Sequence, residues 1–251
     1  MVHFVGAGPG AKDLITIRGK KFIEDADMII YAGSLINPEL LEEAKPGCIL
    51  YDSAKMTLEE VAEKLVWGHG QGMEIVRLHT GDASLYGAVR EQMDILEEKK
   101  IPYDSCPGVS SFCGAASSLN LEYTLTEVSQ SLVITRMAGR TPVPQKESIE
   151  SFAAHQASMA VFLSAGMLGE LRKRLLAGGY QENTPAAIVY KATWEDEIKI
   201  TCSLGELEEK AKERGIKKTA LILVGDVIAH TSYQRSKLYH PEFSTEFRKG
   251  K

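Results

Sequence analysis

Residues 77–87 read RLHTGDASLYG and overlap the apolar segment MEIVRL at residues 73–78. β-Branched and apolar residues after a glycine-rich break predict a buried strand. A helix directly after the turn is predicted by apolar residues at helical spacing: Leu85, Val89, Met93 and Leu96. Residues 80–84 then lie at the carboxyl end of a strand, where open α/β sheets usually bind ligands. The alternative is an ordinary strand-to-helix turn with Ser84 as N-cap.

Composition narrows the class of protein. The 251 residues are 44% hydrophobic and 25% charged, enough for one large core or two modest ones. No apolar run approaches the roughly 20 residues of a membrane span, and no cleavable signal pattern opens the chain. The net charge of -5 gives no general attraction to nucleic acid. We expect a cytoplasmic protein with neither a membrane nor a nucleic-acid partner.

Side chains typical of metal sites and covalent catalysis are scattered. The four cysteines form no CxxC pair and have no histidine at ligand spacing: Cys48, Cys106, Cys113 and Cys202. This usage predicts a reduced protein without a bound metal. No nucleophile elbow, Walker sequence or HExxH helix occurs, so we expect no catalytic nucleophile. His79 is a candidate proton carrier, and a structural histidine at a strand end is the alternative.

Strands and helices alternate along the first half. Apolar strands are predicted at residues 2–5, 28–32, 48–51 and 103–106, with helices at 14–25 and 57–67. Such repetition predicts a parallel sheet with helices on its faces. The second half restarts with strands at residues 131–136, 157–164, 185–191, 197–203 and 220–227. We therefore predict an α/β fold with two domains, residues 1–119 and 120–251.

The first strand runs into GAGPGA at residues 6–11, which matches the dinucleotide-binding pattern GxGxxA. That interpretation needs an acidic residue at the end of the second strand to hold the ribose. The second strand ends in Tyr31, Ala32 and Gly33, with no acid. Pro9 also removes a backbone donor where phosphate would bind. A non-catalytic nucleotide-cofactor-binding or dehydrogenase-like protein is therefore kept only as a third hypothesis.

Six ordered motifs resemble the tetrapyrrole methylase family. They are GAGPG at residues 6–10, HTGDASLYG at 79–87, PGVSS at 107–111, FLS at 162–164, VYKATW at 189–194 and TALILVG at 219–225. Four segments are similar to the members that methylate carbon 11 of precorrin-4 or cobalt-precorrin-4 in vitamin B12 biosynthesis: YAGSL at 31–35, PGVSSF at 107–112, TR with GRTP at 135–142, and ATW at 192–194. One departure is Ala11, where many relatives carry an aspartate.

The resemblance implies two α/β domains, each a sheet flanked by helices, with S-adenosylmethionine in the cleft between them. It also implies a homodimer and a tetrapyrrole substrate. Carried over by position, it implies these cofactor contacts: Pro9, Thr80, Gly81, Asp82, Leu85, Ser110, Ser111, Leu163, Ser164, Ala192, Thr219 and Ala220. Plain strand packing is the alternative for Leu163 and Ala192. The sulfonium methyl is already activated, so the protein mainly aligns the reactants, without a covalent enzyme intermediate, and S-adenosylhomocysteine is the product.

Three charged residues carry more specific expectations. We expect Arg136 and Arg140 to face the acidic arms of the substrate, and a solvated loop paired with acids such as Glu147 is the alternative. We expect Asp82 to hold the cofactor, through its ammonium group or by fixing backbone donors, and an Asx turn is the alternative. Methylation of another precorrin carbon, a protein side chain or RNA is the second functional hypothesis. The sequence leaves open whether the substrate carries cobalt.

Overall fold

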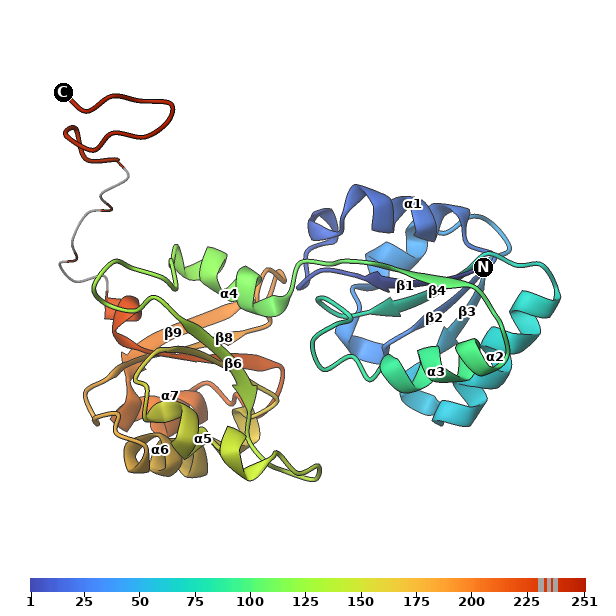
Figure 1. Cartoon of the computed structure of the whole chain (residues 1–251). Coiled ribbons are helices and arrows are strands. Elements are labelled where there is room, and N and C mark those ends of the chain that lie inside the picture. The colour runs from blue at the N-terminus through green and yellow to red at the C-terminus, as the bar shows by residue number, and fades with distance from the viewer. Residues whose placement is uncertain (230–232, 234–235, 237–238) are drawn as a thin grey trace. The chain divides into compact units, whose positions relative to one another are not determined.

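The computed structural model describes residues 1–229, 233, 236 and 239–251. The chain divides into two compact units (Figure 1). Unit 1 comprises Met1–Gly114 and Lys191–Asp196, and unit 2 comprises Ala115–Tyr190 and Glu197–Lys251. A short segment from the second half of the sequence therefore belongs to unit 1. The domain boundary expected after residue 119 stays a prediction.

Unit 1 is built on a five-stranded parallel sheet with the order β3-β2-β4-β1-β5. Its elements are β1 (Val2–Gly6), α1 (Ile17–Asp25), β2 (Met28–Tyr31), β3 (Ile49–Asp52), α2 (Leu58–Gly70), β4 (Ile75–His79), α3 (Arg90–Glu98) and β5 (Tyr103–Cys106). On one face, Ile23 of α1 packs with Val5 and Ile29. On the other face, residues of α2 and α3 pack with Phe4. The parallel sheet predicted for the first half is confirmed.

Unit 2 contains a mixed five-stranded sheet with the order β6-β7-β10-β8-β9, in which only β6 and β7 run parallel. Its strands are β6 (Leu132–Arg136), β7 (Ser158–Phe162), β8 (Pro185–Tyr190), β9 (Ile198–Ser203) and β10 (Ala220–Val224). Its helices are α5 (Ile149–Ala153), α6 (Leu168–Ala177) and α7 (Leu207–Glu213), and α4 (Ser111–Leu119) spans the division between the units. The expected fold, two sheets flanked by helices, is confirmed.

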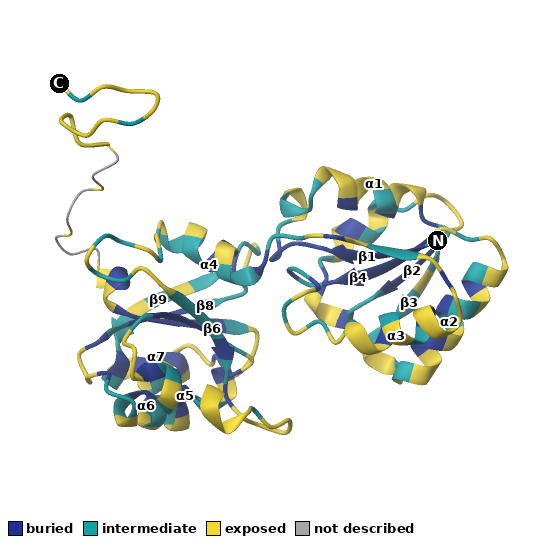
Figure 2. Cartoon of the chain, in the orientation of Figure 1, coloured by how far each residue is buried: buried dark blue, intermediate teal, exposed yellow. Residues whose placement is uncertain are grey.

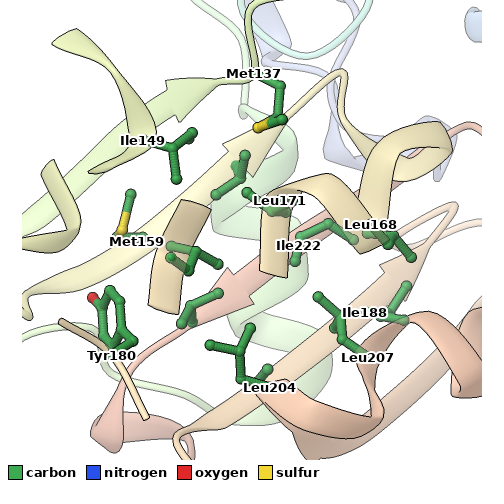
Figure 3. Close-up of a cluster of buried hydrophobic side chains, with 14 of the residues drawn as sticks. Met137, Ile149, Met159, Leu168, Leu171, Tyr180, Ile188, Leu204, Leu207 and Ile222 are labelled. Carbon is green, nitrogen blue, oxygen red and sulfur yellow. The ribbon is translucent and has the colours of Figure 1, made fainter. Parts of the chain in front are cut away.

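The core of unit 2 lies where α5, α6 and α7 cover one face of its sheet (Figure 3). Leu171 of α6 and Leu207 of α7 are fully buried in this cluster, together with Ile222 of β10. Figure 2 shows the same organisation in both units, with buried strands and helices that expose their outer faces. In unit 1, strands β1, β2 and β4 are buried at nearly every position because helices cover both faces of the sheet.

The helix after the central turn begins later than the sequence predicts. Leu85 lies outside it, and α3 starts at Arg90. Tyr86 and Ala88 adopt left-handed φ values of 57° and 49°, which are incompatible with a continuous right-handed helix. The N-cap position is Val89, without a side-chain cap, so the alternative with Ser84 as N-cap is wrong.

Candidate functional site

Three loops meet at the carboxyl ends of β1, β4 and β5 in unit 1. Gly8 and Gly81 exchange backbone hydrogen bonds of 2.8 and 3.2 Å. A Cβ atom on Gly108 would lie 2.1 Å from the carbonyl oxygen of Gly81 and 2.7 Å from the Cα atom of Gly6. Only glycine allows backbones to approach so closely. The glycines of GAGPG, HTGD and PGVSS thus form one layer of packed backbone.

Asp82 connects two of these loops through its carboxylate. Its Oδ1 atom accepts hydrogen bonds from the backbone N–H and the hydroxyl of Ser84, and its Oδ2 atom accepts the N–H of Gly108 at 2.8 Å. Burial raises the pKa of Asp82, but these hydrogen bonds outweigh it and leave the pKa below its ordinary value. The carboxylate is therefore ionised near neutral pH and poorly suited to serve as a general base.

The glycine-rich loop after β1 is held by the segment that returns from the second half of the chain. The indole N–H of Trp194 donates to the carbonyl oxygen of Pro9 at 3.1 Å, and the N–H of Ala11 donates to Thr193 Oγ1 at 3.0 Å. The N–H of Gly8 is bonded to Gly81, and Pro9 has none. The backbone donors that a bound phosphate would use are thus largely occupied within the protein, which argues against a dinucleotide site.

The other cofactor residues predicted for unit 1 lie around the same layer. Thr80 and Leu85 flank the Asp82 turn, and the Leu85 N–H donates to the carbonyl oxygen of Asp82. Ser110 and Ser111 border Gly81, because a Cβ atom there would lie 3.5 and 3.6 Å from their backbone. Ala192 is buried beside Gly10. The structure therefore brings these predicted residues together within one unit: Pro9, Thr80, Gly81, Asp82, Leu85, Ser110, Ser111 and Ala192.

Two buried polar side chains lie beneath the central turn, on one face of β4. Arg77 is 6% exposed and His79 is 4% exposed. Burial lowers the pKa of Arg77 to about 10, so it stays charged near neutral pH. Burial, together with the charge of Arg77, lowers the pKa of His79 to about 3. His79 is therefore neutral, and its Nε2 atom has no hydrogen-bond partner among the described residues, so it is unsuited to carry protons near neutral pH.

In unit 2, four predicted cofactor residues lie where β7 ends and the neighbouring strand β10 begins. Leu163 and Ser164 follow β7, and Thr219 and Ala220 stand where the antiparallel β10 begins. Leu163 and Thr219 have left-handed φ values of 53° and 56°. The Leu163 side chain is 70% exposed despite being apolar. Backbone strain and an exposed apolar side chain together are typical of a ligand site.

Ser164 differs from its neighbours because its hydroxyl is used inside the protein. It is fully buried, donates to the carbonyl oxygen of Phe162 and accepts the N–H of Met137 at 2.9 Å. These bonds join the ends of β6 and β7. The hydroxyl of Ser164 therefore has a structural role, and the cofactor contact expected for this residue stays a prediction.

The two arginines proposed for the substrate have different environments. Arg136 donates to the carbonyl oxygens of Met137, Thr141 and Pro142, so its guanidinium organises its own loop. Arg140 is exposed within that loop. Within the part of the chain that the structure describes, neither guanidinium forms an ion pair, including with Glu147. Arg140 is the more available of the two cations.

The described residues show no feature of a metal site or of a membrane-spanning helix. Within them, no group of three or more His, Cys, Asp or Glu side chains is placed to hold a metal ion. No helix in the same ranges is long and apolar enough to cross a membrane. The four cysteines are free.

The family model of the Tetrapyrrole (Corrin/Porphyrin) Methylases matches residues 1–208. The chain belongs to the tetrapyrrole methylases. It is 52% identical over 248 residues to the cobalt-precorrin-4 C(11)-methyltransferase of Methanocaldococcus jannaschii, covering 99% of this chain and 96% of that protein. It is 40% identical to the precorrin-4 C(11)-methyltransferase of Pseudomonas aeruginosa, covering 99% of each.

Solved structures place this tetrapyrrole methylase in the same fold. The X-ray structure of a cobalamin biosynthetic enzyme, cobalt precorrin-4 methyltransferase, has a TM-score of 0.89 and 37% identity, covering 90% of this chain and 95% of the other. Uroporphyrin-III C-methyl transferase from Thermus thermophilus, complexed with S-adenosylhomocysteine, has a TM-score of 0.74 and covers 94% of this chain and 96% of the other. At 23% identity, that second likeness concerns the fold alone.

Sequence patterns alone do not reveal the roles of several residues that shape the site of this methylase. Gly108 and Trp194 stood within recognised motifs, but nothing indicated their partners Asp82 and Pro9. Arg77 was visible as a charge inside an apolar strand, a pattern that indicates a buried and specifically bonded cation. Arg77 donates a hydrogen bond from Nε to Gln92 Oε1 at 2.9 Å, and Gln92 gave no signal beyond its place on the predicted helix.

Proposed function

We propose that this chain transfers a methyl group from S-adenosylmethionine to carbon 11 of cobalt-precorrin-4 or precorrin-4, giving the precorrin-5 stage of vitamin B12 biosynthesis. The observation that carries the proposal is the 52% identity to a cobalt-precorrin-4 C(11)-methyltransferase over nearly the whole of both chains. The structural likeness to a cobalt precorrin-4 methyltransferase, at 37% identity, also supports it.

The predicted cofactor residues of unit 1 and those of unit 2 have side chains suited to S-adenosylmethionine, which combines a nucleoside with an amino acid. In unit 2, exposed Leu163 offers an apolar surface for an adenine ring, and the small residue Ala220 stands at the same end of the sheet. The ionised carboxylate of Asp82 supplies negative potential near a ligand ammonium while it fixes the turn. At about 4 Å and an effective dielectric of 20, such an attraction is near 4 kcal/mol before desolvation is subtracted.

The chemistry assigned to the protein is orientation. When bound, the cofactor supplies an activated sulfonium methyl group. The packed glycine layer fixes Thr80, Gly81 and Asp82, and the hydrogen bond from Trp194 fixes Pro9. Because both loops are already ordered, they lose little conformational entropy when the reactants bind. Alignment of this kind lowers a barrier by about 7 to 11 kcal/mol in favourable cases. The proposed reaction involves no covalent bond to a side chain of this site.

The loop after β6 is assigned to the substrate. Arg140 faces solvent without an ion-pair partner among the described residues, and a precorrin carries several carboxylates. Guanidinium groups bind carboxylates through paired, permanently charged contacts. Arg136 acts indirectly. Its three hydrogen bonds to carbonyl oxygens of the loop fix the position of Arg140.

A test of this function uses S-adenosylmethionine labelled in its methyl group and a panel of acceptors. The panel contains cobalt-precorrin-4, precorrin-4, uroporphyrinogen III and a structured RNA, and the products are read by mass spectrometry. Labelling of a precorrin-4 form alone is expected. Labelling of a different tetrapyrrole would support another acceptor within the same fold, and cofactor binding without transfer to any acceptor would contradict the proposed reaction. Light scattering after size exclusion tests the homodimer that we also propose.

A further inference from the structure

A chain of hydrogen bonds runs from the buried guanidinium of Arg77 to the strained segment after the Asp82 turn. The Nε atom of Arg77 donates to Gln92 Oε1 at 2.9 Å, and Gln92 Nε2 donates to the carbonyl oxygen of Ala88 at 2.9 Å. Gln92 is only 5% exposed and lies on the first turn of α3. The Arg77–Gln92 bond is therefore shielded from bulk water, whereas the bond to the exposed residue Ala88 is partly buried.

The orientation of the Gln92 amide is fixed by its neighbours. A guanidinium can only donate and a backbone carbonyl can only accept, so the amide oxygen must face Arg77 and the amide nitrogen must face Ala88. Arg77 is anchored in turn by bonds to the carbonyl oxygens of Ile30 and Leu78. The network thus passes from the sheet, through one side chain of α3, to a single backbone carbonyl.

The carbonyl at the end of this network belongs to an unfavourable conformation. Ala88 has a φ of 49° and Tyr86 a φ of 57°. A Cβ atom on Gly87 would lie 2.2 Å from the carbonyl oxygen of Ala83, so the segment folds back on the turn itself. Left-handed conformations are unfavourable for non-glycine residues and persist only where the surroundings enforce them.

The positive charge in this network is also unusual. Within the described residues, no carboxylate forms an ion pair with Arg77, although its guanidinium is buried and charged. Removing a cation from water without a counter-ion is strongly unfavourable. An apolar side chain at this strand position would avoid that penalty, so stability alone does not account for the arginine.

We propose that Arg77 and Gln92 are positioning residues that hold residues 85–89 in their strained conformation and thereby set the cofactor-binding turn at Thr80–Leu85. The inference rests on the proposed function, because the turn is taken as part of the S-adenosylmethionine site. It assigns neither residue a contact with substrate or cofactor. Their effect passes through the Ala88 carbonyl to the backbone of the turn.

The variant Gln92→Glu separates positioning from stability. Glutamate keeps an acceptor for Arg77 and gives the buried guanidinium a counter-ion, so its melting temperature should equal or exceed that of the parent protein. It has no N–H to donate, and it sets a carboxylate oxygen against the Ala88 carbonyl. We expect S-adenosylhomocysteine to bind about tenfold more weakly, measured by calorimetric titration. Gln92→Met, which loses both bonds, should lower affinity and melting temperature together.

Amide hydrogen exchange of the free protein gives a second readout. Gln92→Glu should accelerate exchange at residues 83–89 while β4 and the rest of α3 stay protected. Gln71→Glu makes the same chemical change on the exposed C-cap of α2 and should alter neither measurement. Unchanged affinity in Gln92→Glu, or accelerated exchange throughout α3, would overturn the inference. A parent protein that does not bind S-adenosylhomocysteine would instead contradict the proposed function.

Discussion

The indole N–H of Trp194 donates a hydrogen bond to the carbonyl oxygen of Pro9, 3.1 Å away, across 185 positions of the sequence. The same indole fills the space beside Gly10, where a Cβ atom would lie 2.2 Å from the ring. Lys191 stands 5.3 Å from the ring centroid and pairs with Asp196. A segment encoded late in the chain thus fixes the first loop of unit 1.

Trp194→Phe tests this attachment. Phenylalanine keeps an aromatic ring beside Gly10 but leaves the buried Pro9 carbonyl without its donor, so we expect a loss of about 1 to 2 kcal/mol in the free energy of unfolding, measured in urea. Trp67→Phe, which changes the only other tryptophan at a half-exposed position on α2, should stay within about 0.5 kcal/mol of the parent protein. Equal losses in the two variants would remove the special role of Trp194.

Asp82→Asn should affect both the turn and the acid sensitivity of the protein. An amide nitrogen facing either the Ser84 or the Gly108 N–H removes one of the three bonds, so S-adenosylhomocysteine should bind more weakly and stability should fall by about 1 to 3 kcal/mol. Normal binding with abolished turnover would instead establish a proton-transfer role for Asp82.

The sign of the pH effect follows from the lowered pKa of Asp82. Its contribution to stability is present above its ordinary pKa of 3.8 and is lost as the pH falls through the still lower value of the folded state. Asp82→Asn lacks this titration, so its stability should fall less steeply than that of the parent protein below about pH 5. Parallel stability curves for the two proteins would contradict this assignment.

Leu163 offers a test of strain at a ligand site. Asparagine tolerates the left-handed conformation better than leucine, so Leu163→Asn should retain or slightly increase stability. It removes an apolar surface, and we expect roughly tenfold weaker binding of S-adenosylhomocysteine. Leu163→Met keeps the apolar contact and should bind nearly normally. Full affinity in Leu163→Asn would exclude this side chain from the cofactor site.

Substitutions of Arg140 and Arg136 should have different effects on substrate KM and on stability. Arg140→Gln should raise the KM for the tetrapyrrole several-fold, with unchanged binding of S-adenosylhomocysteine and unchanged melting. Arg136→Gln should lower stability by about 1 to 2 kcal/mol as well, because carbonyl oxygens of its loop lose their donor. A substrate KM that stays unaltered in both variants would place this loop outside the substrate site.

The sequence predicted the elements better than their junctions. The strand at residues 73–78 corresponds to β4, and the helix at residues 57–67 corresponds to α2. The pattern of apolar residues indicates which residues face a core, so it predicted the strands. It could not show that Tyr86 and Ala88 are left-handed, because that conformation is imposed by packing and by the Gln92 bond. The helix was therefore predicted to begin too early.

The candidate site was predicted as motifs rather than as contacts. Family resemblance indicated that GAGPG, HTGD and PGVSS belong together, and the structure supplies the reason in the backbone contacts of Gly6, Gly81 and Gly108. The bond from Gly108 to Asp82 spans 26 positions and that from Trp194 to Pro9 spans 185. Local patterns carry no information on partners so distant, which is why the structural roles of Asp82 and Trp194 required the fold.

The ring carbon that receives the methyl group can be identified directly. Incubation of the protein with cobalt-precorrin-4 and S-adenosylmethionine carrying a carbon-13 methyl group, followed by nuclear magnetic resonance of the isolated product, locates the transferred carbon directly. We predict a single enriched methyl group attached to carbon 11, and one equivalent of S-adenosylhomocysteine for each product molecule. Enrichment at a different ring carbon, or S-adenosylhomocysteine formed without an enriched tetrapyrrole, would contradict the account.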